Sequence, residues 1–106
     1  MIEVKIARDA DTATAFITGD IDHHTARDVR EQIDAYVQEI RPSLLNLDFS
    51  QVQFMDSSGV GLIMGRYRIM QTLNGSVSVV NVPAHLKRLI KMSGLLALGV
   101  IKEGEV

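Results

Sequence analysis

The sequence has 106 residues, a net charge of −2, 46% hydrophobic and 23% charged side chains, and neither cysteine nor tryptophan. These values are typical of one globular domain and exclude an intrinsically disordered chain. The lack of cysteine excludes a disulfide framework, a zinc–thiolate site and a thiol nucleophile. We expect one cytoplasmic domain over residues 1–106, because neither a secretory signal pattern nor an apolar run of about 18 residues is present.

The first part of the chain carries the patterns of two strands and a helix. Apolar and polar residues alternate over 2–6, and a second strand-like run covers 13–18 after a polar turn, which predicts a β-hairpin. Over 24–40 the apolar residues fall three or four apart, which predicts a helix of about four turns. Asp22 or Thr25 is its candidate N-cap.

The middle of the chain predicts a buried strand and a second helix. Residues 44–49 are largely apolar and predict a short central strand, followed by a loop that ends at Met55. Helical spacing of apolar residues resumes over 57–73. We expect Gly75 to end this helix in the left-handed conformation.

The last third predicts a strand, a helix and a further strand. The β-branched run 76–82 is typical of a strand, and Pro83 opens a helix at its first turn that ends before Gly94. A last short strand is predicted over 99–102. The order β-β-α-β-α-β-α-β indicates an α/β domain with a mixed β-sheet and crossover helices.

The charges are divided unevenly along the chain. Residues 1–56 hold eleven acidic and five basic side chains, whereas residues 57–102 hold six basic side chains and no acidic one. A folded surface that mixes the two halves is the simpler interpretation. The alternative is a basic face for an acidic partner.

Phe-Met-Asp-Ser-Ser-Gly-Val-Gly at 54–61 stands between a predicted strand and a helix, at the sheet edge where α/β proteins bind ligands. The glycine spacing GxGxxxG, with no acidic residue about 20 positions later, excludes a dinucleotide fingerprint. A phosphate-binding P-loop lacks its Gly-Lys-Ser/Thr end, and a serine hydrolase lacks the nucleophile elbow G-x-S-x-G. Gly61 and Gly65 more simply let the helix approach a neighbour closely.

Two further interpretations concern the acidic residues and the serines of this region. Asp20, Asp22 and Asp56 could converge on a metal, but capping or surface roles are the better interpretation, and no metal or cofactor is expected. Ser57 and Ser58 follow Asp56, a natural N-cap, and so lie exposed in the first turn of the helix. The helix dipole tolerates a phosphate there, which would make the patch anionic and could switch off a binding surface. On these grounds alone a plain cap remains the simpler alternative.

The motif at 54–61, followed by Gly-Arg-Tyr at 65–67, resembles the signature of the STAS domain family of bacterial anti-sigma factor antagonists. Segments 19–26, 87–89 and 92–95 resemble the sporulation branch of that family, and the resemblance covers nearly the whole chain. It implies a single STAS domain whose unphosphorylated form binds an anti-sigma factor that is also a serine kinase, releasing a sigma factor. The kinase then uses its ATP to phosphorylate the antagonist, and a PP2C-type phosphatase reverses the step.

Carried onto this sequence, the resemblance assigns the phosphate acceptor to the first serine after the aspartate, Ser57. It implies a protein that is not an enzyme, has no catalytic residue, binds neither nucleic acid nor membrane, and is a monomer. The alternative is a STAS phospho-switch of a general stress-response or other partner-switching pathway. The residues expected at the partner surface are Asp20, Asp22, His23, His24, Thr25, Asp56, Ser58, Gly59, Val60, Ile63 and Arg66.

A nucleic-acid-binding module is an alternative of a different class. It would use basic residues of the second half, but it lacks interleaved aromatic residues beyond Tyr67 and a strongly positive charge. The residues that would carry it are Arg66, Arg68, Lys87, Arg88 and Lys91.

Overall fold

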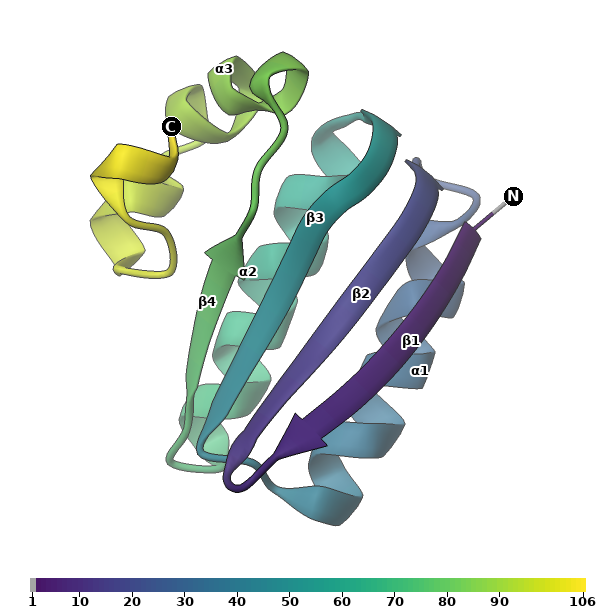
Figure 1. Ribbon diagram of the computed structural model, residues 1–106, viewed down its shortest axis with the longest axis vertical. Coiled ribbons are helices and arrows are strands. Elements are labelled where there is room, and N and C mark those ends of the chain that lie inside the picture. The colour runs from purple at the N-terminus through teal and green to yellow at the C-terminus, as the bar shows by residue number, and fades with distance from the viewer. Residues whose placement is uncertain (1) are drawn as a thin grey trace.

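The computed structural model describes residues 2–106, except for the side chain of Glu103 (Figure 1). Four strands, three α-helices and two short 3-10 helices alternate along the chain. They are β1 (Ile2–Asp9), β2 (Thr12–Ile21), α1 (Ala26–Ile40), β3 (Leu44–Met55), α2 (Ser57–Thr72), β4 (Ser76–Val80), α3 (Ala84–Met92), η1 (Leu95–Leu98) and η2 (Glu103–Glu105). Met1, the first residue of the predicted domain, lies outside the described residues.

The strands form one mixed sheet in the order β1-β2-β3-β4. β1 and β2 form the predicted antiparallel hairpin, whereas β2–β3 and β3–β4 are parallel pairs. Figure 1 shows α1 and α2 together behind the sheet, with α3 and the C-terminal 3-10 helices beyond β4. Because β2 and β3 are parallel and Ile21 pairs with Met55, the two segments that follow these strands begin side by side.

The core lies between the sheet and the two crossover helices. Alternate residues of β2 point toward it, and α1 contributes the stripe spaced four residues apart that the sequence predicts. Burying side chains of this size stabilises the fold by about 1.5–3 kcal/mol each. The largest fully buried side chains are Phe49, Ile17, Ile21, Ile33, Leu45, Leu47, Ile63, Met70, Ile90, Leu95, Val29 and Val37.

The loop predicted before Met55 is wrong, because β3 continues through this segment to Met55. Thr18 of β2 pairs with Gln51, and Val52 and Met55 are buried on the core side. The register shifts between Phe16 and Thr18, because β3 contributes one residue more than β2 over this stretch. The polar residues of β3 in this segment lie on the outer side of the sheet.

The predicted last strand over 99–102 does not form. Gly99 has φ 75° and ends the 3-10 helix η1, which turns the backbone away from an extended path. The Val79 N–H donates to the Val100 carbonyl at 2.7 Å, and Val100 and Ile101 are buried. The apolar character of the segment therefore serves packing against β4 and not a fifth strand.

The structure contradicts the predictions made for three glycines, Gly61, Gly65 and Gly75. Asn74, with φ 60°, is the left-handed residue after α2, and Gly75 is needed because a Cβ there would lie 2.6 Å from Met70 Cε and 3.1 Å from the Pro42 carbonyl oxygen. Gly61 and Gly65 have open space where a Cβ would stand, so neither allows a close helix approach. Gly94, with φ 85°, follows α3 as predicted.

Within residues 2–106, no helix combines the length and the apolar character needed to cross a membrane.

Candidate functional site

The candidate site lies at the edge of the sheet where β2 and β3 end. The Asp56 N–H donates to the Ile21 carbonyl at 3.1 Å, which joins the start of α2 directly to the end of β2. Segment 20–26 and the first turn of α2 are thereby brought together from positions about thirty-five residues apart in the chain.

Asp56 caps α2 as predicted. Its backbone is extended, and its carboxylate accepts the Ser58 N–H at 2.8 Å, while its carbonyl accepts the Gly59 N–H at 3.0 Å. These bonds satisfy donors that the first turn of a helix otherwise leaves without partners. Ser57 is therefore the first helical residue with an exposed side chain, whereas Ser58 is half-buried and not fully exposed as predicted.

Gly59 has a packing role at this turn. It is buried, and a Cβ at this position would overlap with Sδ and Cγ of Met55, the last residue of β3. Met55 is itself 5% exposed, so it has little room to move aside. The glycine therefore lets α2 start directly against the end of β3.

Replacing Gly59 with alanine is expected to destabilise the protein by about 1–3 kcal/mol, because the added methyl group overpacks the contact with Met55. Gly61→Ala is the matched control, since its Cβ would meet nothing within 4 Å, and alanine is the better helix former by about 1 kcal/mol. Urea denaturation should show Gly59→Ala below wild type and Gly61→Ala at or above it. Equal stability of the two variants would contradict the packing role.

A network of hydrogen bonds shapes segment 20–26. The Asp22 carboxylate accepts the N–H groups of His24 at 2.8 Å and Thr25 at 3.0 Å, and these bonds lower the pKa of that carboxyl group. The Thr25 hydroxyl accepts the Asp22 N–H at 3.0 Å and donates to the Asp20 carbonyl at 2.7 Å. Thr25 holds the N-cap position of α1, but its side chain makes no capping bond to the helix.

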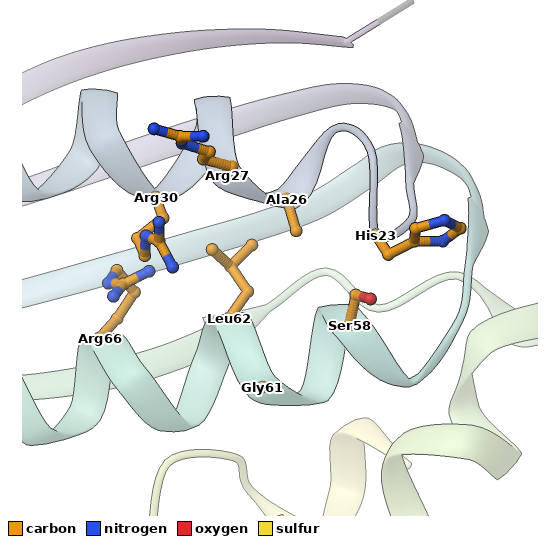
Figure 2. Close-up of a pocket in the computed structure, with 8 residues that line it drawn as sticks. All are labelled: His23, Ala26, Arg27, Arg30, Ser58, Gly61, Leu62 and Arg66. Carbon is orange, nitrogen blue, oxygen red and sulfur yellow. The ribbon is translucent and has the colours of Figure 1, made fainter.

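A groove with a volume of about 370 Å³ runs between the N-terminal halves of α1 and α2. Figure 2 shows Arg30 of α1 and Arg66 of α2 facing each other across it, with Ser58 projecting from the first turn of α2. The groove is lined by His23, Ala26, Arg27, Arg30, Ser58, Gly61, Leu62 and Arg66.

Arg66 forms a buried ion pair with Asp34. Its Nε lies 2.8 Å from Asp34 Oδ1, and the two side chains are 4% and 21% exposed. Burial lowers the pKa of the Arg66 guanidinium and raises the pKa of the Asp34 carboxyl, and the attraction between the two groups opposes both shifts. The pair therefore joins α1 to α2 at the end of the groove that lies away from Ser58 (Figure 2).

The structure brings most of the predicted partner residues to one surface, but not all. Ile63 is completely buried in the core, and Arg66 is only 3% exposed and borders the groove between α1 and α2, so neither presents an exposed side chain in the unbound protein. Gly59 is buried as well, and Val60 is half-buried. His23 and His24 are exposed, with ring centroids 4.0 Å apart.

Sequence reasoning missed two basic residues of the site, Arg27 and Arg30. They stand three apart on the first turns of α1, a spacing that places both on one face of the helix. That spacing could have indicated a shared surface, although it does not show which helix they face.

The acidic residues at this edge do not form a metal centre. In the part of the chain that the structure describes, no three acidic, histidine or cysteine side chains are grouped for metal binding. The carboxylates of Asp22 and Asp56 are both directed at backbone N–H groups.

The sequence is similar to those of known anti-sigma factor antagonists. The anti-sigma F factor antagonist of Paenibacillus polymyxa is 39% identical over 90 residues, which cover 85% of this chain and 77% of that protein. The anti-sigma-B factor antagonist of Listeria monocytogenes is 33% identical over 107 residues, covering 99% of this chain and 92% of that protein.

Solved structures show the same fold. The anti-sigma factor antagonist SpoIIAA in its unphosphorylated form has a TM-score of 0.80 at 25% identity, covering 94% of this chain and 86% of that chain. The Bacillus cell fate determinant SpoIIAA in its phosphorylated form has a TM-score of 0.72 at 25% identity, covering 94% and 89%. The STAS domain family itself matches residues 2–104. The chain therefore belongs to the STAS domain family.

Proposed function

We propose that this protein is an anti-sigma factor antagonist whose unphosphorylated form binds an anti-sigma factor and so releases a sigma factor. Relatives that share 39% and 33% of their residues with it are antagonists of anti-sigma F and anti-sigma-B factors. The observation that carries the proposal is the exposed Ser57, directly after its capping aspartate and beside segment 20–26.

Ser57 is the proposed phosphate acceptor. Its hydroxyl is accessible to a kinase, and it stands at the first position of a helix, where the dipole and the N-terminal amides favour a negative charge. A phosphate there adds a charge of about −1.5 to −2 without breaking a capping bond, because Asp56 makes the cap. The resemblance to SpoIIAA, which is known in phosphorylated and unphosphorylated forms, supports the same assignment.

The phosphate would act on binding through charge. It would join the carboxylates of Asp20, Asp22 and Asp56 on one small surface, and the sum would repel an acidic partner surface. The proposed partner surface comprises Asp20, Asp22, His23, His24, Thr25, Asp56, Ser57, Ser58 and Val60.

The proposed partners are an anti-sigma factor that is itself a serine kinase and supplies ATP, and a PP2C-type serine phosphatase that removes the phosphate. The protein acts as a monomer in the cytoplasm and catalyses no reaction itself. The carboxylates of Asp22 and Asp56 support this passive role, because both accept hydrogen bonds from backbone amides.

Incubating the protein with its anti-sigma factor and ATP is expected to add one phosphate, at Ser57. Tandem mass spectrometry locates it, and Ser57→Ala should abolish the modification while Ser58→Ala retains it. A phosphate on Ser58 or on any other residue would overturn the site assignment, and no phosphate at all would overturn the kinase proposal.

A stress-response pathway is the second candidate for the same switch. The Listeria antagonist of the anti-sigma-B factor aligns with 99% of this chain. Measuring the affinity for anti-sigma F and anti-sigma-B factors side by side decides between the pathways, because the cognate factor should bind more tightly.

A further inference from the structure

The groove between α1 and α2 has an unbalanced set of charges. Arg27 Nε lies 3.0 Å from Glu31 Oε1, and Arg66 is paired with Asp34. Arg30 forms no ion pair or hydrogen bond with any residue that the structure describes. Asp34 also attracts Arg30 electrostatically, so Arg27, Arg30 and Arg66 share the two carboxylates of Glu31 and Asp34, which leaves the groove with one excess positive charge.

The groove also contains a buried donor without an acceptor. Arg66 Nη1 is inaccessible and has no hydrogen-bond partner among the described residues, and the contact of Arg66 Nε with Asp34 is an ion pair without hydrogen-bond geometry. Leaving a buried donor unsatisfied costs about 1–3 kcal/mol. Arg66 lines the groove, so an acceptor that enters between the two helices lies next to this guanidinium group.

We propose that the groove binds the carboxylate of an aspartate or glutamate presented by the anti-sigma factor, an inference that rests on the proposed function. The two oxygens of a carboxylate match two facing guanidinium groups, and Arg30 and Arg66 face each other from α1 and α2 (Figure 2). A monoanion also matches the single unbalanced charge. Leu62 and Ala26 provide an apolar wall for the methylene groups of the same side chain.

This arrangement connects the groove to the phosphate switch. Ser58 lines the groove, and Ser57 precedes it in the same helical turn. A phosphate on Ser57 would stand close to the groove and repel a carboxylate that approaches it. The phosphate and the partner's carboxylate would therefore compete for the same positive charges.

Arg30 provides the first test, because it is exposed and its replacement removes no ion pair formed with a described residue. Isothermal titration calorimetry with the ADP-bound anti-sigma factor should show Arg30→Gln at least tenfold weaker than wild type, and Arg30→Glu weaker still. Arg88→Gln, an equal charge change on the exposed side of α3, should leave the affinity unchanged.

The outcomes separate the groove from the proposed function. Wild-type affinity of Arg30→Glu, together with weakened binding of Ser57→Asp, would overturn the carboxylate site and leave the antagonist function intact. Absence of binding by the wild-type protein would overturn both. Equal weakening by Arg30→Gln and Arg88→Gln would reduce the effect to net charge and also overturn the site.

A single introduced cysteine tests occupancy of the groove directly. The chain has no cysteine, and Gly61 lines the groove with open space for a side chain. Excess anti-sigma factor should slow alkylation of Gly61→Cys by iodoacetamide at least tenfold, and should leave Gly104→Cys, at the C-terminal end, unprotected. Protection of Gly61→Cys by millimolar inorganic phosphate alone would identify a phosphate site and overturn the carboxylate assignment.

Discussion

Ser57→Asp is expected to bind the anti-sigma factor about 100-fold more weakly than wild type, whereas Ser57→Ala binds with unchanged affinity. The loss corresponds to about 2.7 kcal/mol and arises because like charges brought together at an interface cost several kcal/mol. Ser57 is exposed at the start of α2, so the added carboxylate lies on the partner surface beside Asp56. Isothermal titration calorimetry against the ADP-bound anti-sigma factor measures the difference.

Folding does not confound this comparison. An aspartate at the first turn of a helix is favoured by the dipole by about 0.3–1 kcal/mol, so Ser57→Asp should unfold at the same urea concentration as wild type or slightly above it. Asparagine has nearly the same shape as aspartate but carries no charge, so Ser57→Asn should bind like wild type. Equal affinities of the Asp and Asn variants would refute a charge mechanism.

Asp34→Ala should lower the free energy of unfolding by about 3 kcal/mol. The change leaves the Arg66 guanidinium buried without its counter-ion, and removing one partner of a buried ion pair is strongly destabilising. Urea denaturation followed by circular dichroism gives the value directly.

Two control variants isolate the buried charge as the cause. Glu31→Ala breaks the exposed pair with Arg27 and should cost less than about 0.5 kcal/mol. Adding Arg66→Met to Asp34→Ala should recover most of the loss, because an apolar stem replaces the unpaired charge. A double variant as unstable as Asp34→Ala alone would show that the cost comes from lost packing.

The periodic elements of the fold could be predicted from the sequence. The alternation over 2–6 and the helical spacing over 24–40 both gave elements of the right type in the right order. The continuation of β3 was missed because Gln51 and Gln53 are exposed polar residues on the outer side of the strand. Polarity there reflects the open side of the sheet, which local composition does not distinguish from a loop.

The candidate site could be predicted in part. The cap at Asp56 and the exposed Ser57 follow from local helix chemistry, which short sequence patterns carry. The pairing of Arg66 with Asp34 depends on how two helices align across the sheet, and no pattern within either helix encodes it. The same pair joins an acidic residue of the first half of the chain to a basic residue of the second half.

The attachment of α2 to the end of β3 has a consequence for timing. Met55 and Gly59 pack the first turn of the helix against the strand, and Asp56 fixes its backbone. Under the proposed function, we expect this packed and hydrogen-bonded turn to keep its backbone when Ser57 is phosphorylated, so that the two signalling states differ by a covalent mark and not by a slow rearrangement. The speed of the response is then the speed of phosphate transfer and removal, and the record of the last signal persists after the partners separate.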